Sequence, residues 1–263
     1  MSAAARLELV ALAGIPKIQS GDDIAAICAQ SLARTGLELR TGDVLVFAQK
    51  IISKAEGRQV DLSTIVPGPR AIELAAQVVK DPRLVELVLR ESRRVVRTAK
   101  DVLIVEHRLG FIMANAGIDQ SNVGDPKQGE YALLLPEDPD ASAERLRATL
   151  ATRSGCALGV IINDSFGRPW RVGTVGVAIG CAGVAATRDL RGHRDLFNRT
   201  LRITVVGHAD EIAAAASLVM GQANEGRPIV LVRGLGVASA AQAGFESQPA
   251  SALLRPSGED LFK

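Results

Sequence analysis

The stretch Ala157-Leu158-Gly159-Val160-Ile161-Ile162 is apolar throughout and is followed at once by Asn163-Asp164. A short apolar run bounded by polar turn-forming residues predicts a buried strand. The run Asp43-Val44-Leu45-Val46-Phe47-Ala48 has nearly the same character and predicts a second one. These two strands require a fold that contains a sheet, and the segments around them decide which kind.

Strand and helix patterns alternate only in part along the rest of the chain. Further strands are predicted at 7–12, 94–98, 102–106, 172–180, 201–206 and 229–232, and helices at 22–33, 71–79, 82–91, 140–153 and 210–223. This pattern fits an α+β fold or a regular doubly wound sheet. A domain boundary would fall near 65–70 or 136–141, where Pro and Asp cluster. The tail after residue 244 has little periodicity, and we expect it to fray.

The composition excludes several classes of protein. The chain has 263 residues, 47% of them hydrophobic and 23% charged, which is typical of globular proteins. A net charge of +2 and 3% aromatic residues argue against nucleic-acid binding. The longest stretch without a charge, 172–187, carries four glycines and is shorter than the ~18 apolar residues that a membrane span needs.

The cysteines and the N-terminus predict a location. Cys28, Cys156 and Cys181 are odd in number and far apart, which excludes a disulfide framework and a CxxC metal site. The first residues lack the features of a secretory signal. We therefore expect a cytoplasmic protein that is not bound to a membrane.

Two polar stretches follow apolar strands, and each carries an aspartate. The first is Asn115-Ala116-Gly117-Ile118-Asp119-Gln120-Ser121-Asn122, and the second is Asn163-Asp164-Ser165-Phe166-Gly167-Arg168. Carboxylate and hydroxyl oxygens are the ligands that Mg²⁺ prefers beside phosphates, and an arginine binds phosphate or carboxylate through two hydrogen bonds. The alternatives are a tight turn held by Asn and Asp side chains, and an exposed loop with solvated arginines.

Two more segments offer groups that bind phosphate. Lys50 and Lys54 are four residues apart, so a helix places both ammonium groups on one face; lysines on a solvated helix face are the alternative. The segment 220–227 offers backbone amides to phosphates, or is an ordinary helix stop with Gly226 as its cap. No GxxxxGK[ST] motif occurs, which excludes an ordinary P-loop nucleotidase.

Taken together, these segments resemble one family, the coenzyme F420-0:L-glutamate ligases, also called gamma-glutamyl ligases. The resembling blocks occur in family order at 14–16, 42–46, 53–58, 114–123, 164–171, 178–180, 189–192, 209–211 and 220–234. They cover nearly the whole chain. The resemblance implies a two-domain α+β fold with mixed sheets and packed helices, in an intertwined homodimer. We expect a ligase domain over 1–244, possibly of two subdomains, and a C-terminal tail over 245–263.

The resemblance also implies the reaction. GTP is the co-substrate, L-glutamate and coenzyme F420-0 are the other substrates, and two divalent ions, Mg²⁺ or Mn²⁺, assist, with K⁺ as a further candidate ion. The terminal carboxylate of the acceptor takes the γ-phosphate of GTP, and the amine of glutamate displaces phosphate from the acyl phosphate. GDP and phosphate are released, and further γ-linked glutamates can be added.

The family's functional residues carry over to individual positions of this chain. The catalytic residues implied are Asp119, Asp164, Lys54 and Arg168. The metal ligands implied are Asp119, Asp164, Ser165 and Gln222, with Ser165 standing where members commonly have Thr. The nucleotide contacts implied are Ile15, Pro16, Lys17, Ile18, Gln49, Lys50, Lys54, Asn122, Met220, Gly221, Gln222, Ala223, Asn224, Glu225, Gly226 and Arg227. Gln49 departs from a frequent Ser or Thr.

Two other functions remain open from the sequence. One is a deazaflavin- or nucleotide-binding protein of the same fold without ligase activity. The other is a ligase that acts on a different phosphodiester-linked carboxylate. Formation of a product with release of GDP distinguishes the first from an enzyme, and the identity of the acceptor distinguishes the second.

Overall fold

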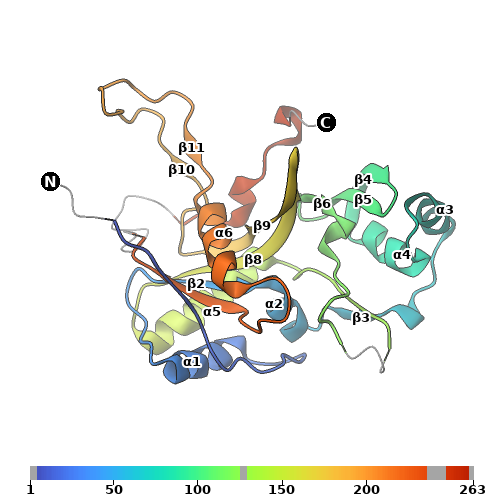
Figure 1. Ribbon diagram of the computed structural model, residues 1–263, viewed down its shortest axis with the longest axis horizontal. Helices are drawn as coiled ribbons and strands as arrows, with labels where there is room; N and C mark the ends of the chain where they lie inside the picture. Colours follow the sequence, from blue (N-terminus) through green and yellow to red (C-terminus); the bar gives the residue numbers. More distant parts are fainter. Residues whose placement is uncertain (1–4, 125–128, 236–246, 261–263) are drawn as a thin grey trace.

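A five-stranded mixed sheet forms the centre of the protein (Figure 1). The computed structural model describes residues 5–124, 129–235 and 247–260. The strands of the sheet lie in the order β1 (Glu8–Ala11), β12 (Ile229–Arg233), β2 (Val44–Ala48), β8 (Gly159–Arg168) and β9 (Arg171–Ala182). β2 and β8 pair in parallel, and the other neighbouring pairs are antiparallel. The carboxyl ends of β2 and β8 therefore lie at the same edge of the sheet.

Both faces of this sheet are covered, which explains why β2 is apolar without alternation. Leu45 and Phe47 pack on one face together with the helices α1 (Ile24–Thr35) and α5 (Pro139–Ser154). Val44 and Val46 face the other way and pack with α6 (His208–Met220). Figure 1 shows α6 and the pair α1 and α5 on opposite sides of the sheet.

The ends of α1 follow directly from the sequence. The carboxylate of Asp23 accepts a hydrogen bond from the backbone N–H of Ala26 and caps the helix. Gly36 ends it at φ 71°, in the left-handed region that glycine adopts without strain. The helix predicted at 22–33 is thus confirmed, although it begins at Ile24 and ends at Thr35.

A third hydrophobic cluster lies outside the central sheet and is built from residues 60–134. Its helices are α3 (Pro69–Val78) and α4 (Pro82–Arg90), and its strands are β4 (Ser92–Ala99), β5 (Val102–His107) and β6 (Ile112–Ala114). The short strands β3 (Gln59–Asp61) and β7 (Tyr131–Leu133) pair beside it. Short 3₁₀ turns occur at Leu62–Thr64, Asn115–Gly117, Ala250–Leu253 and Ser257–Glu259. Figure 1 shows α3 and α4 at the far right of the molecule.

Side chains at the border of this cluster contact the part of the protein around the central sheet. Phe111 packs edge to face on Phe166 of β8, with ring centroids 6.0 Å apart. Glu91, at the end of α4, pairs with Arg58 at 3.0 Å and with Arg108 at 3.2 Å. Burial opposes ionisation of Glu91, but these cations and His107 together lower its pKa to about 2. The two parts of the chain that carry Asp119 and Asp164 are therefore tied together by apolar and ionic contacts.

A two-stranded arm extends from the body of the protein at the top left of Figure 1. It begins with β10 (Arg188–Asp189) and returns through β11 (Val205–Val206). Leu196, Phe197 and Ile203 on this arm are at least 80% exposed. The strand predicted at 201–206 is therefore wrong over its first residues, because only Val205 and Val206 pair with β10.

Three other predictions are corrected by the structure. The strand predicted to end at Asn163-Asp164 continues to Arg168, because β9 supplies hydrogen-bond partners along its whole second half. The helix predicted to reach residue 223 ends at Met220. The tail does not fray where it is described, because the Ala250 side chain is fully buried and its N–H bonds to Asp140. The predicted boundary at 244/245 lies outside the described residues.

The predicted α+β class with mixed sheets is confirmed, while the two-domain division and the homodimer stay predictions. Cys28, Cys156 and Cys181 are free thiols, as expected. Across the described ranges, the model contains no helix both long enough and apolar enough to cross a membrane.

Candidate active site

The candidate site forms at the carboxyl ends of the parallel strands β2 and β8. Ala48, the last residue of β2, lies opposite Asn163 of β8. The helix α2 (Gln49–Ala55) starts directly after β2. Its first turn, which contains Lys50, therefore lies beside β8, the strand that carries Asp164. The two lysines lie on this helix four residues apart, as predicted. Parallel pairing thus brings together two segments more than 100 residues apart.

Asp119 comes to this edge from the third cluster. Its backbone pairs with that of Leu133, which fixes the strand-like segment after the turn at Asn115–Gly117. Asp119 Oδ2 lies 2.6 Å from Lys50 Nζ. Asp119 Oδ1 accepts hydrogen bonds from the N–H of Ser121 at 2.7 Å and from its hydroxyl at 2.8 Å. Burial raises the pKa of Asp119, but the hydrogen bonds from Lys50 and Ser121 outweigh it and the net shift is downward.

Asp164 shows the opposite shift. Burial raises its pKa to about 6, although the backbone N–H of Ser165 donates to Oδ1 at 2.8 Å. The negative charge of Asp119 raises this pKa further, and the positive charge of Lys50 lowers it. The three groups therefore lie within range of one another's charge. An irregularity in the β8–β9 ladder occurs between Ile162 and Asn163, directly before Asp164.

Lys54 extends the positive side of the site. Its ammonium group donates to the backbone carbonyl of Asn122 at 2.5 Å. Burial lowers the pKa of Lys54, and the charges of Lys50 and Lys17 lower it further. Three of the predicted nucleotide contacts are therefore cations close to one another. Asn122 in turn donates through Nδ2 to the carbonyl of Ala223 at 3.1 Å, which joins the Asp119 loop to the segment 220–227.

The segment 220–227 is fastened to β8 and turns back on itself. Ser165 donates through its hydroxyl to Gln222 Oε1 at 2.7 Å, so two predicted metal ligands are in direct contact. Glu225 accepts from the N–H of Ala223 at 2.8 Å, and backbone N–H groups of this turn lower the pKa of Glu225. Gly221, at φ 80°, ends α6, and a Cβ there would lie 2.3 Å from the Glu225 carboxyl carbon. Met220 is buried, whereas residues 222–227 are exposed or partly exposed at the protein surface.

Other predicted residues are less directly engaged. Arg168 ends β8 four residues beyond Asp164, about 13 Å further along an extended strand, and donates to the carbonyl of Gly173 at 3.3 Å. Gln49 is 3% exposed, and its side chain accepts a hydrogen bond from the Ser53 hydroxyl, so the predicted nucleotide contact lies on a buried residue. Ile18 belongs to the core, and Ile15 packs against it, while Pro16 and Lys17 are exposed.

Sequence reasoning did not assign a role to Ser121 or Asn163. Ser121 holds both Asp119 and Lys50, and its position two residues after an aspartate is the usual signal for such a turn. Asn163 is 3% exposed and donates to Ser217 of α6 at 3.1 Å, which fixes the end of α6 against β8. A buried contact of this kind leaves no signal in the sequence.

The residues present fit a hard divalent cation that also binds phosphate oxygens. In the part of the chain that the structure describes, no group of three or more His, Cys, Asp and Glu side chains is arranged to hold a metal by itself. Asp119 and Asp164 would supply two carboxylates to such an ion, and Ser165 and Gln222 would supply neutral oxygens. Magnesium is commonly held by one or two carboxylates, with phosphate and water completing its shell.

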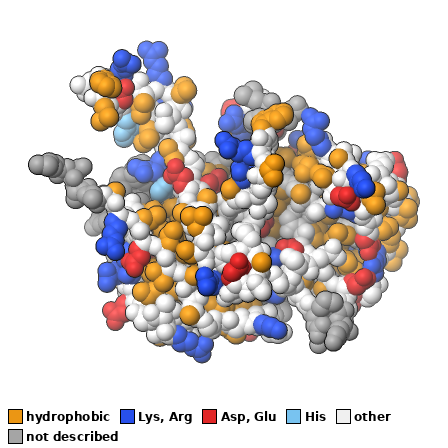
Figure 2. Space-filling view, viewed as in Figure 1, with side chains coloured by type: hydrophobic (Ala, Val, Ile, Leu, Met, Phe, Trp, Pro, Cys, Tyr) orange, Lys and Arg blue, Asp and Glu red, His pale blue; other side chains and the backbone are white. Residues whose placement is uncertain are grey.

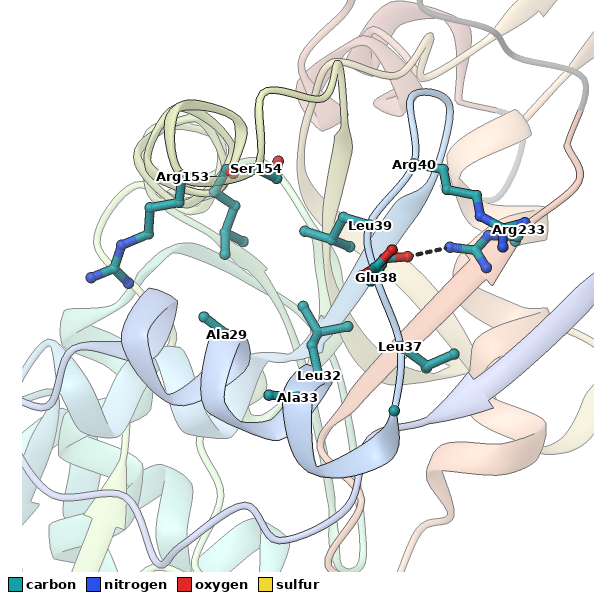
Figure 3. Close-up of a pocket in the computed structure, with 12 residues that line it drawn as sticks. Ala29, Leu32, Ala33, Leu37, Glu38, Leu39, Arg40, Arg153, Ser154 and Arg233 are labelled. Atoms are coloured by element: carbon teal, nitrogen blue, oxygen red, sulfur yellow. Dashed lines mark hydrogen bonds between the residues drawn. The ribbon is translucent and has the colours of Figure 1, made fainter.

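A separate hollow of about 760 Å³ lies at the opposite end of β2, between α1 and α5 (Figure 3). Arg233 lines it, donates to the carbonyl of Glu38 at 2.8 Å and pairs with Asp43 at 2.7 Å. Asp43 directly precedes β2, whereas α2 and the candidate site follow it. None of the predicted site residues lines this hollow.

Comparison of the sequence with known families identifies the class of protein as a family of ligases. A profile of the family described as F420-0:Gamma-glutamyl ligase matches residues 14–234, and the chain belongs to this family. The chain is 48% identical to the coenzyme F420:L-glutamate ligase of Methanothermobacter thermautotrophicus over 87% of its length and 89% of that protein. It is 46% identical to the protein of that name from Methanopyrus kandleri, over 94% of both chains. The corresponding protein of Archaeoglobus fulgidus is 45% identical over 89% of this chain and 90% of its own.

Proposed function

We propose that this protein ligates L-glutamate to coenzyme F420-0 at the expense of GTP, and can add further γ-linked glutamates. The names of its relatives support the acceptor and the amino acid. The observation that carries the proposal is the meeting of Asp119, Asp164 and the lysines of α2 at one edge of the sheet. A site of this composition suits a polyanionic nucleotide and an acceptor that also carries negative charge.

The proposed reaction has two steps. A carboxylate oxygen of the acceptor attacks the γ-phosphorus of GTP, the bond to the bridging oxygen breaks, and GDP leaves with the electron pair. The amine of glutamate then attacks the acyl carbon, loses a proton, and expels inorganic phosphate as the amide forms. Little covalent chemistry is needed from the protein, so catalysis rests on positioning and on neutralising charge.

Each group at the site has a proposed part in this reaction. Asp119, Asp164, Ser165 and Gln222 hold two ions of Mg²⁺ or Mn²⁺, which neutralise charge on the phosphates when bound, and K⁺ is a further candidate. Lys50, Lys54 and Lys17 attract the triphosphate. Arg168 is a proposed catalytic residue, and it would have to leave the Gly173 carbonyl to reach a substrate. The exposed segment 222–227 is the proposed binding site of the guanine nucleotide.

We also propose a homodimer and a cytoplasmic location. The arm built on β10 and β11 carries Leu196, Phe197 and Ile203 almost fully exposed, and Figure 2 shows apolar side chains gathered near its end. A two-stranded ribbon is marginally stable alone, so a second copy of the chain is the expected cover. Gel filtration with light scattering checks this, and a monomeric wild-type protein would contradict it. The three free thiols fit a reducing compartment.

One assay tests the proposed activity. The purified protein is incubated with GTP, L-glutamate, Mg²⁺ or Mn²⁺ and the acceptor, and the masses of the products are followed. We expect one or more added glutamyl groups, with one GDP released for each. Binding of the acceptor without release of GDP would favour the non-catalytic alternative, and turnover with only another phosphodiester-linked carboxylate would favour the other ligase.

Two variants connect the activity to the site. Asp164→Asn removes a proposed metal-binding charge, and we expect turnover to fall by at least about 100-fold because charge stabilisation of a phosphoryl transfer is lost. Lys54→Ala is expected to weaken GTP binding about 10-fold or more in calorimetry. Near-normal turnover in the first variant, or unchanged affinity in the second, would refute the role assigned to that residue.

A further inference from the structure

Lys50 is bound to the Asp119 loop through all the hydrogen bonds that an ammonium group can donate. Its Nζ contacts Asp119 Oδ2 at 2.6 Å, the Ser121 hydroxyl at 2.9 Å and the Ser121 carbonyl at 3.2 Å. A lysine has three N–H donors, and each here has an acceptor. Lys50 therefore belongs to the acidic loop in this state rather than extending toward solvent.

Asp119 is correspondingly occupied on both oxygens. Oδ1 accepts two hydrogen bonds from Ser121, and Oδ2 holds the ammonium group of Lys50. A carboxylate offers about four acceptor positions, so three are in use. A cation that binds Asp119 must either displace Lys50 or remain next to its positive charge.

Neighbouring lysines increase the competition between Lys50 and a divalent ion for Asp119. The positive charges of Lys50 and Lys17 both act on Lys54, whose ammonium group donates to the backbone carbonyl of Asn122. The site therefore contains three positive side chains and the two carboxylates of Asp119 and Asp164. Without a phosphate the local balance favours positive charge and repels a divalent ion.

We propose that the ammonium group of Lys50 occupies the place of a metal ion on Asp119. Lys50 keeps divalent ions off this carboxylate until a nucleoside triphosphate binds and the ammonium group moves to its phosphates. The inference rests on the proposed function, since it concerns the metal-binding role of Asp119. Phosphate oxygens offer Lys50 a more highly charged partner than Asp119 does. Binding of the nucleotide then frees Asp119 from Lys50, so the nucleotide and the divalent ion each raise the affinity of the site for the other.

The test measures Mn²⁺ binding to the full-length protein without nucleotide, from the electron paramagnetic resonance signal of free Mn²⁺. We expect Lys50→Gln to bind Mn²⁺ at least 10-fold more tightly than wild type, because Asp119 Oδ2 is freed. Lys50→Arg keeps the charge and should bind as weakly as wild type. Side-chain exposures of 29% for Lys50 and 32% for Asp119 make the substitutions tolerable for folding, which circular dichroism verifies.

Lys54→Gln is the matched control. It removes one positive charge from the same helix but leaves the Lys50–Asp119 pair intact, so its effect on Mn²⁺ affinity should stay below about 3-fold. Equal tightening in Lys50→Gln and Lys54→Gln would mean that general repulsion acts, and would overturn the inference. Unchanged affinity in Lys50→Gln would overturn it as well.

The product assay separates this inference from the ligase proposal. If wild type forms the glutamylated product while Lys50→Gln binds Mn²⁺ no more tightly than wild type, Lys50 does not take the place of the metal on Asp119. The ligase proposal then stands. If Lys50→Gln binds Mn²⁺ tightly while wild type forms no product with any acceptor, the exchange on Asp119 stands and the proposed reaction fails.

Discussion

Replacing Asp164 by asparagine is expected to stabilise the metal-free protein while lowering its proposed activity at least about 100-fold. Asn has nearly the same shape as Asp and keeps an oxygen that can accept the hydrogen bond from the Ser165 N–H. What it removes is a negative charge that burial disfavours, since the pKa of Asp164 is raised from 3.8 to about 6. The charged form of this side chain therefore lowers the stability of the fold.

The magnitude and the pH window follow from this pKa. A raised pKa means that the folded protein binds the proton more tightly than the unfolded chain does. Wild-type stability therefore falls as pH rises from about 3.8 to about 6, by roughly 3 kcal/mol for a shift of this size. Because the residue keeps a partly exposed surface, we expect about 2 kcal/mol at pH 7.5. For a chain of this length this corresponds to a rise in Tm of about 4–8 °C.

Urea unfolding of metal-free wild type and Asp164→Asn at pH 4 and pH 7.5 measures the effect. The free energies of unfolding should differ little at pH 4, close to the unfolded pKa of 3.8, where the folded protein holds the proton and most of the penalty is absent. At pH 7.5 they should differ in favour of the variant. Asp119→Asn is the control with the opposite sign, because the pKa of Asp119 is lowered and its pair with Lys50 is lost. An Asp164→Asn variant that is equally or less stable at pH 7.5 would refute the argument.

The remaining predictions concern how the site is held. Glu91→Gln should lower the free energy of unfolding by about 2–3 kcal/mol at pH 7, since it leaves Arg58 without its charge partner. Because the pKa of Glu91 is about 2, this difference should disappear as pH falls from 4.5 toward 2. Urea titrations at several pH values would detect it. Gly176→Ala should cost about 1–3 kcal/mol in thermal unfolding and weaken Mn²⁺ binding, because its Cβ would lie 2.2 Å from the Ser217 hydroxyl of α6. Gly167→Ala, on the same hairpin with no atom within 4 Å, should be neutral, and equal losses at both glycines would contradict this reasoning.

Many of the local elements could be predicted because their signals are local. Asp23 and Gly36 bound α1 as capping residues do, and the apolar run 44–48 forms a buried strand. The end of β8 differs from the prediction because the polar residues after Ile162 suggest a turn, whereas β9 pairs with them from 171 onward. Pairing with a distant partner overrides local propensity, and a single sequence carries no record of the partner.

For this protein the sequence by itself determined the chemical groups: two aspartates after apolar strands, and two lysines at helical spacing. It also determined the family, because motifs in a fixed order do not depend on the packing between them. Only the tertiary structure decided that Asp119 pairs with Lys50, that Asp164 is held with a raised pKa, and that Arg168 lies further along β8. The physical reason is that charge interactions depend on distance and burial, and both are set by contacts between segments far apart in the chain.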